Sequence, residues 1–358
     1  MQSSSQPFIH EAHAVRIVFG AGTSDQVADE VGRLGARRAL VLCTPNQVAE
    51  AQRVSDLLDS LSAGIFPGAV MHVPVESARE AVARVRTAGA DCVVAIGGGS
   101  TTGLGKAIAL ETGMPILAIP TSYAGSEMTP IYGLTEAGLK KTGRDPRVLP
   151  RTVIYDPALT VGLPVGLTVT SGLNAIAHAA EGLYARDANP VMSLMAEEGI
   201  RALAAGIPAV FREPTDLDAR AQCLYGAWLC GTVLGSVGMA LHHKLCHTLG
   251  GSFNLPHAET HAIVLPHAMA YNVAAAPEAM ARIQRATGAT GVSAPAALFD
   301  LAARHGTPVA LRDIGMREQD LESATDIALA NPYWNPRPIE REPIRALLQA
   351  AYDGVRPA

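Results

Sequence analysis

Short apolar runs alternate with amphipathic stretches through the first 157 residues of the chain. The amphipathic stretches carry apolar side chains at helical spacing, as in Val27, Val31 and Leu34. The apolar runs have the length and composition of strands that are buried on both faces. They are residues 16–19, 39–43, 70–75, 91–96 and 116–119. This alternation predicts a mostly parallel sheet flanked by helices, as in a Rossmann-like α/β domain.

Beyond Asp156-Pro157 only helical periods remain, and the last strand-like run covers residues 153–155. The predicted helices are residues 173–184, 191–205, 217–237, 239–249, 278–287, 295–305 and 344–352. A chain of 358 residues is longer than one compact core usually supports. We therefore predict an α/β dinucleotide-binding domain over residues 1–157 and an all-helical substrate and catalytic domain over residues 158–358.

Composition then narrows the functional classes. The formal net charge is −5 and no basic run exceeds two residues, which argues against a nucleic-acid partner. No stretch approaches the roughly 18–20 apolar residues of a membrane helix, and the N-terminus has no hydrophobic signal core. We therefore expect a cytoplasmic protein. The five cysteines are scattered through apolar stretches, which is typical of small buried side chains.

A glycine-rich loop, Gly97, Gly98, Gly99 and Ser100, joins the strand predicted at residues 91–96 to a helix. Glycines let the backbone approach a diphosphate, and the helix N-terminus supplies free N–H groups. A second loop with hydroxyl side chains follows the next strand, and ligands of such sheets bind at the strands' carboxyl ends. The further predicted cofactor contacts are Thr121, Ser122, Thr129 and Lys106. The alternatives are a simple turn, a capped helix start and an exposed lysine.

The preference between NADH and NADPH is left open. A site that prefers NAD usually places an acid at the adenosine ribose, near the end of an early strand. The corresponding segment here is Thr44-Pro45-Asn46-Gln47, which contains no acid. Thr44 is therefore a predicted contact, and the missing carboxylate leaves room for a 2′-phosphate.

Histidines are concentrated in one short segment of the second half. Of the 11 histidines in the chain, five lie between residues 241 and 261. They are His242, His243, His247, His257 and His261. Upstream, Asn174 and His178 are four residues apart in a predicted helix and share one face. Imidazoles suit iron or zinc, but a redox metal site normally adds a carboxylate, and Asn174 is a poor ligand.

Together these segments resemble the iron-type alcohol dehydrogenases over nearly the whole chain. That family has a Gly-Gly-Gly-Ser-x-x-Asp-x-x-Lys loop, which residues 97–106 match except that Gly103 replaces the aspartate. It also has a Ser-Glu-x-Thr segment, which residues 126–129 match. The family's metal ligands are an aspartate and three histidines. The matching positions here are Asn174, His178, His243 and His257, so the spacing is kept and the aspartate is lost.

Both departures are similar to the maleylacetate reductase branch of that family. The same branch is indicated by residues 99–104, 121–130 and 331–338. This resemblance implies an NADH- or NADPH-dependent reduction of the conjugated C=C bond of maleylacetate to give 3-oxoadipate, in the catabolism of aromatic compounds. It also implies a homodimer. Because the carboxylate ligand is lost, we expect that no metal is required.

The resemblance also implies roles for particular side chains. His243 is the first candidate for the oxyanion partner or general acid, with His178, His257 and Asn174 beside it. Tyr123 either donates a hydrogen bond or packs between the domains. The dicarboxylate substrate needs cationic or N–H partners. The candidates are His242, Lys140, Lys141, Lys244 and Arg337, each with a solvated surface charge as the alternative.

Three other functions remain open at this stage. A metal-dependent alcohol or polyol dehydrogenase of the same superfamily would hold iron or zinc. A lyase resembling dehydroquinate synthase would use the dinucleotide only transiently. A dinucleotide sensor would bind the cofactor without turnover, although the dense histidine cluster argues against it.

Overall fold

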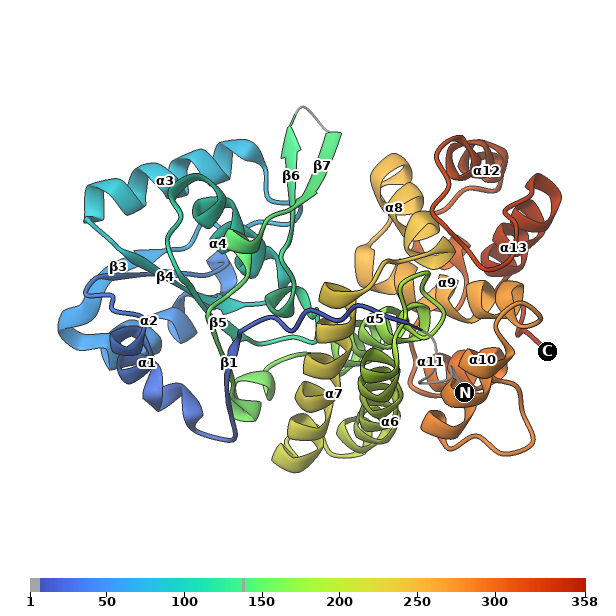
Figure 1. The fold of residues 1–358 in the computed structure, drawn as a ribbon, viewed down its shortest axis with the longest axis horizontal. Helices are drawn as coiled ribbons and strands as arrows, with labels where there is room; N and C mark the ends of the chain where they lie inside the picture. The colour runs from blue at the N-terminus through green and yellow to red at the C-terminus, as the bar shows by residue number, and fades with distance from the viewer. Residues whose placement is uncertain (1–6, 137–138) are drawn as a thin grey trace. The chain divides into compact units, whose positions relative to one another are not determined.

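The computed structural model describes residues 7–136 and 139–358 (Figure 1). Contacts divide the chain into an N-terminal unit, Ala12–Leu163, and a helical unit, Pro164–Ala358, with which residues 7–11 are grouped. The division at Leu163 lies slightly beyond the boundary predicted after residue 157. The Asp156 carboxylate explains the difference, because it accepts hydrogen bonds from the backbone of Gly22, Ser24 and Ala158 and so ties the next short helix to the N-terminal unit.

The N-terminal unit contains a six-stranded sheet in the order β1-β8-β5-β4-β2-β3, and every pairing is parallel. Its strands are β1 (Arg16–Phe19), β2 (Ala39–Leu42), β3 (Ser62–Phe66), β4 (Cys92–Gly97), β5 (Ile116–Pro120) and β8 (Thr152–Tyr155). The strand predicted at residues 70–75 is wrong. Met71 is exposed there and Pro74 is the N-cap of the next helix, so this segment is a turn and the strand lies earlier, in β3.

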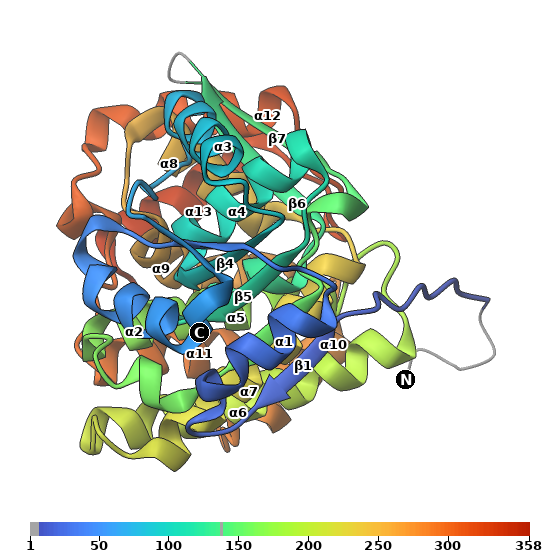
Figure 2. The same ribbon diagram turned by 90° about the vertical axis from the view of Figure 1, so that its left-hand side faces the viewer.

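Helices cover both faces of this sheet (Figure 2). They are α1 (Val27–Arg33), α2 (Val48–Leu58), α3 (Val75–Ala88) and α4 (Gly99–Thr112). Alternate residues of β2 enter opposite cores: Leu40 and Leu42 pack with α3 and α4, whereas Ala39 and Val41 pack with α1 and α2. An antiparallel hairpin, β6 (Ile131–Glu136) and β7 (Leu139–Arg144), completes the strands described in this unit. The predicted parallel α/β architecture is confirmed.

In the helical unit the described residues form no strand, as the sequence predicted. The helices are α5 (Val165–Gly182), α6 (Pro190–Arg212), α7 (Leu217–Ser236), α8 (Leu241–Phe253), α9 (His257–Asn272), α10 (Pro277–Thr287), α11 (Ala294–Arg304), α12 (Leu321–Ala330) and α13 (Arg341–Asp353). Helix α5 is buried along most of its length and contacts α6, α7 and α9. It therefore places its polar side chains inside the unit.

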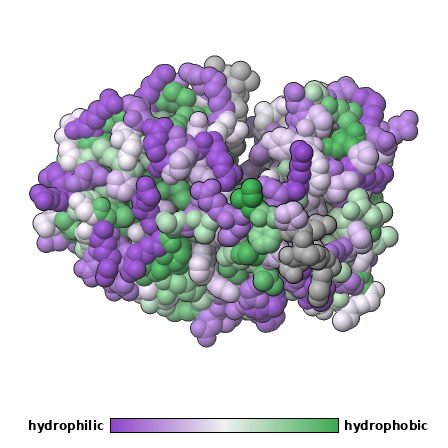
Figure 3. Space-filling model, viewed as in Figure 1, coloured by the Kyte–Doolittle hydropathy of each residue, from purple (hydrophilic) through white to green (hydrophobic). Residues whose placement is uncertain are grey.

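The surface mixes polar and apolar residues on the face shown in Figure 3. Among the described residues, no single helix combines the length and apolarity needed to cross a membrane. Helices α7 and α8 reach those values only when taken together, as a pair bent by 96°.

Candidate active site

The ends of three neighbouring strands are linked by hydrogen bonds on the N-terminal unit. The N–H of Thr121, after β5, donates to the carbonyl of Gly97 at the end of β4 at 3.0 Å. The Gln47 amide, after β2, donates to the Thr121 hydroxyl at 3.0 Å, and the Thr44 hydroxyl donates to the Gln47 carbonyl oxygen at 3.0 Å. The structure therefore brings together Thr44, Gly97 and Thr121. Gln47 was missed because an amide beside a proline gives no distinct signal.

The glycine loop has little room for side chains. Gly97 has a φ of +149°, and a Cβ there would lie 2.4 Å from the Thr101 hydroxyl. A Cβ on Gly98 would lie 2.9 Å from the Ser122 hydroxyl. Gly98 is the N-cap of α4, and no side chain caps this helix. Backbone N–H groups at its first turn are therefore suited to bind an anionic ligand, with Gly99 and Ser100 half-exposed beside them.

Lys106 is buried and holds the loop after β5 in place. Its Nζ lies 2.7 Å from the Ser126 carbonyl, 2.8 and 2.9 Å from the carbonyl and hydroxyl oxygens of Thr129, and 2.7 Å from the Ile131 carbonyl. Three N–H bonds thus meet four acceptors. The cofactor contacts of Lys106 and Thr129 stay predictions, and in this structure the polar groups of these two side chains bond to each other. Tyr123, in the same loop, is fully buried.

Burial lowers the pKa of Lys106 to about 7, and the nearby Glu127 carboxylate opposes this shift. Glu127 is itself buried and accepts a hydrogen bond of 2.8 Å from the Tyr155 hydroxyl. All four partners of Nζ are acceptors, so the arrangement suits the charged ammonium.

Three helices of the helical unit bring the histidines together. Helix α5 carries Asn174, His178 and Glu181, α8 carries His242, His243, Cys246 and His247, and α9 begins at His257 and carries His261. The His243 ring centroid lies 5.2 Å from that of His178 and 5.1 Å from that of His261. The rings of His257 and His261 are 4.4 Å apart. The sequence thus predicted the cluster, and the structure adds a carboxylate from Glu181.

Three of the four family-matched positions have a buried polar atom without a hydrogen-bond partner among the described residues, whereas His257 is exposed at the start of α9. Asn174 Oδ1, His178 Nδ1 and His243 Nε2 accept or donate no hydrogen bond there. Burial is the main cause that lowers the pKa of His178, and the neighbouring His243 adds to the effect. A neutral imidazole with an unused nitrogen is the form that binds a metal ion or a polar substrate group.

A second group lies beside these positions. His242 Nε2 and His261 Nδ1 form a hydrogen bond of 3.0 Å, and the Cys246 thiol lies 3.6 Å from His242 Nε2. The ligand atoms of these three buried residues all lie within 4.8 Å of one another. Two imidazoles and a sulfur are donors that zinc or iron accepts. Cys246 and His261 were not predicted as site residues, because their importance depends on packing between α8 and α9.

The segment of residues 331–338 is bound to the helices of the cluster. The Tyr333 hydroxyl lies 3.1 Å from His247 Nδ1, and the Lys244 ammonium lies 5.9 Å from the centre of the Tyr333 ring. Arg337 donates to the Tyr271 carbonyl at 3.1 Å and stacks on the Tyr271 ring at 4.1 Å. Arg337 therefore anchors this segment to α9, which gives it a structural use besides its predicted substrate role.

The other predicted substrate cations are scattered. Lys141 forms an exposed ion pair of 2.7 Å with Glu136 on the β6–β7 hairpin. The side chain of Lys140 lies outside the described residues. His242 is fully buried, and Lys244 is half-buried on α8. Of this set the structure brings only Lys244 and His242 to the helix that carries His243.

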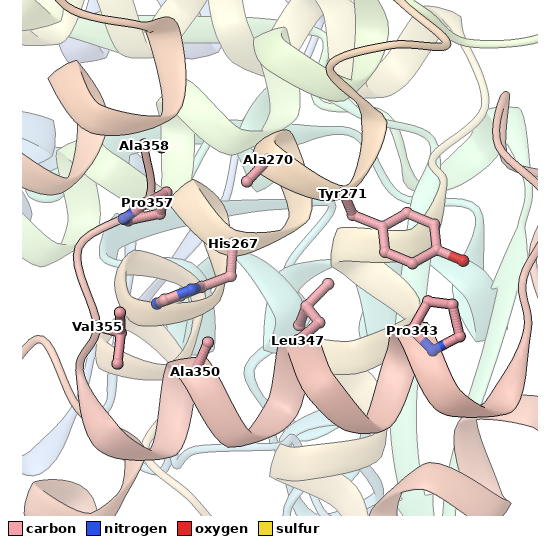
Figure 4. Close-up of a pocket in the computed structure, with 9 residues that line it drawn as sticks. All are labelled: His267, Ala270, Tyr271, Pro343, Leu347, Ala350, Val355, Pro357 and Ala358. Atoms are coloured by element: carbon pink, nitrogen blue, oxygen red, sulfur yellow. The ribbon is translucent and has the colours of Figure 1, made fainter.

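Cavities open on the surface of the helical unit. One, of about 260 Å³, is lined by α9, α13 and the C-terminal segment (Figure 4). His267 points toward Val355 and Pro357 there, and none of the predicted site residues takes part. Another, of about 420 Å³, is lined by Arg186, Asp187, Gly238, Met239 and Trp334. Arg186 is an exposed cation that the sequence analysis missed, since a lone arginine gives no signal.

Comparisons with known proteins cover the whole chain. The model described as iron-containing alcohol dehydrogenase matches residues 14–157, and the C-terminal model of the Fe-containing alcohol dehydrogenase family matches residues 168–352. Maleylacetate reductase of Burkholderia cepacia is 64% identical, over 98% of this chain and 99% of its own. The structure of maleylacetate reductase from Agrobacterium tumefaciens is 58% identical, with a TM-score of 0.95 over 98% of this chain and 100% of its own.

A structure from Ralstonia eutropha JMP134 assigned to the alcohol dehydrogenases is 84% identical, with a TM-score of 0.98 over 99% of this chain and 100% of its own.

These matches correct the expectation that no metal is required. The matching family is one of iron-containing enzymes, and His242, Cys246 and His261 form a group able to hold an ion. The unpaired donors Asn174 Oδ1, His178 Nδ1 and His243 Nε2 also fit an ion. The expectation relied on the lost aspartate alone, and spacing could not show that Glu181 supplies a carboxylate beside His243.

Proposed function

Because the chain belongs to the iron-containing alcohol dehydrogenase family, we propose that it reduces the conjugated C=C bond of maleylacetate with NADH or NADPH to give 3-oxoadipate. Relatives named maleylacetate reductase share 53–64% of its residues over 96–98% of the chain. The structural observation that carries the proposal is the buried histidine cluster, in which His243 Nε2 is left for a reacting group.

The reaction is a conjugate hydride addition. Hydride from the nicotinamide attacks the alkene carbon β to the ketone, and the electron pair moves through the enone onto the ketone oxygen. The enolate then takes one proton at the carbon between the new C–H and the carbonyl. One cofactor is oxidised, one C=C bond is reduced and one proton is consumed.

The enolate oxygen needs a hydrogen-bond donor or cation as its charge develops. His243 supplies a nitrogen at that position, with His178 and His261 beside it. A bound divalent ion, held by unpaired donors of the cluster such as His178 Nδ1 and His243 Nε2, would supply Lewis-acid stabilisation of the same oxygen. Burial keeps water from competing for these groups.

The two substrate carboxylates need cationic partners. Lys244 lies on α8 beside His243, and Arg186 lines the cavity that also contains Trp334. We place the carboxylates at these two cations. Both side chains lie on the helical unit, so the whole recognition of the dicarboxylate belongs to that unit.

The dinucleotide belongs at the glycine loop of the N-terminal unit. Its diphosphate fits the uncapped first turn of α4, and the hydroxyls of Thr121 and Ser122 border the same loop. The proposal extends to a cytoplasmic homodimer that works in the catabolism of aromatic compounds.

The direct test is oxidation of NADH or NADPH by the purified chain in the presence of fresh maleylacetate, followed by identification of 3-oxoadipate. His243→Asn should lower kcat by about 10²–10³-fold, the usual effect of removing an oxyanion partner. His305→Asn, just after α11, is the matched control and should leave kcat unchanged. Metal content is measured on the same samples, because the family implies an ion.

Other outcomes point to other functions. Oxidation of an alcohol without reduction of maleylacetate would favour the alcohol or polyol dehydrogenase. Product formation without net change of the nicotinamide would favour the lyase.

A further inference from the structure

Glu181 is fully buried near the end of α5 and faces the start of α8. Its Oε1 accepts the N–H of His242 at 2.6 Å, and its Oε2 accepts the N–H of Ala240 at 2.8 Å and of His243 at 3.4 Å. Helix α8 has no side-chain cap of its own. The carboxylate therefore caps α8 from a neighbouring helix and places its negative charge at the helix N-terminus.

The same Oε2 lies 2.7 Å from His243 Nδ1. A further contact of this carboxylate is the Tyr184 hydroxyl at 3.5 Å from Oε1, so each of these neighbours donates and the carboxylate only accepts. The proton of a neutral His243 must then sit on Nδ1. Its Nε2 carries the lone pair, and this is the buried atom without a partner among the described residues.

From this geometry we propose that Glu181 is a positioning residue of the active site, which fixes the ring orientation and the Nδ1–H tautomer of His243. A carboxylate that holds one nitrogen of an imidazole makes the other nitrogen a better ligand or base. The inference takes its substrate from the proposed function. In this tautomer His243 Nε2 carries a lone pair, so it can bind an ion or accept a proton directly, and donation to the enolate oxygen requires that Nε2 be protonated as well.

The first test needs no substitution. The full wild-type chain is labelled with ¹⁵N-histidine and treated with a chelator, so that no paramagnetic ion broadens the signals. Long-range ¹H–¹⁵N spectra then report which ring nitrogen carries the proton, and the signal missing in His243→Asn assigns the residue. We expect His243 as the Nδ1–H tautomer. The Nε2–H tautomer in the folded wild-type chain would overturn the proposal.

The second test is Glu181→Gln, which replaces two acceptors with one acceptor and one donor. We expect kcat for maleylacetate to fall by about 10–100-fold with KM changed by less than about threefold, as for other residues that orient a ligand. The His243 signal should also lose its single tautomer. Glu198→Gln, at an exposed ion pair with Arg201, is the matched control and should change neither.

A merely structural cap makes a different prediction. Glu181→Gln would then lower the melting temperature while the folded fraction kept its kcat and its His243 tautomer, and that result would exclude a positioning role. If the variant does not fold, the wild-type spectrum still decides. If the wild-type chain does not reduce maleylacetate, the proposed function fails, while the tautomer result tests the inference separately.

Discussion

At the scale of single residues, Lys106 is a buried charge whose hydrogen bonds stabilise one loop of the fold. All three N–H bonds of its ammonium meet oxygens of residues 126–131. Water cannot replace these bonds, because the side chain is only 1% exposed. The segment that follows β5 therefore depends on this one charge.

We predict that Lys106→Met lowers the free energy of unfolding of the N-terminal unit by about 3 kcal/mol or more, since several buried acceptors lose their donor. Denaturant unfolding followed by circular dichroism measures this loss. Lys141→Met removes an exposed ion pair and should change the free energy of unfolding by no more than about 0.5 kcal/mol. Unchanged stability with weaker NADH binding would instead assign the ammonium to the cofactor.

Residue roles were predictable from the sequence only where a pattern exposed them. The spacing of His178, His243 and His257 is enough to predict a cluster. Glu181 lies three residues after His178, in a helix of mostly small and apolar residues, and an acid there can equally be a surface charge. Its role follows from the packing of α5 against the start of α8, because its partners are 59–62 residues away in the chain.

At the scale of elements, the turn from β4 into α4 combines the features of an anion site. The strand ends in a glycine with positive φ, the helix begins without a side-chain cap, and Gly98 lies close to Ser122 of the neighbouring loop. These features follow from the sequence, because glycines after a buried apolar run predict them. The position of β3 was not predictable in this way, since residues 70–75 have strand-like composition but form a turn that leads into α3.

We predict that Gly98→Val weakens NADH binding by about tenfold or more, because its side chain would meet the Ser122 hydroxyl and occupy the space for the diphosphate. Titration of NADH fluorescence measures the dissociation constant. Gly32→Ala on α1 is the control, since a Cβ there meets nothing within 4 Å, and it should leave NADH binding unchanged. Unchanged affinity in Gly98→Val would move the cofactor away from this loop.

At the scale of the whole molecule, the chain consists of a parallel α/β unit and a helical unit. The parallel sheet and the helical unit were both predictable, because a change of hydrophobic period marks the passage between them. The metal was not, since the sequence shows a lost aspartate but not the donors that α5, α8 and α9 bring together. These candidate ligand atoms all belong to the helical unit. That unit therefore contains most of the buried imidazoles.

This concentration makes the helical unit sensitive to acid. Burial lowers the pKa of His267 from 6.5 to about 4, and burial is also the main cause that lowers the pKa of His178, His242 and His261. Between pH 6.5 and pH 4 the unfolded chain then binds more protons at these positions than the folded chain. Stability must therefore fall as the pH falls, by up to about 1.4 kcal/mol per pH unit for each such histidine.

We predict that His267→Leu removes one such contribution, so that the free energy of unfolding falls less steeply between pH 6.5 and pH 4 than in the wild-type chain. Denaturant unfolding at a series of pH values measures the slope. The comparison uses the slope of the free energy of unfolding against pH, and not its absolute value, because leucine also changes the packing of the cavity beside α13. The exposed His10→Leu should keep the wild-type slope. Removal of a buried neutral His267 must change the number of protons taken up on unfolding. If His267→Leu kept the wild-type slope, the acid sensitivity would therefore arise from other groups.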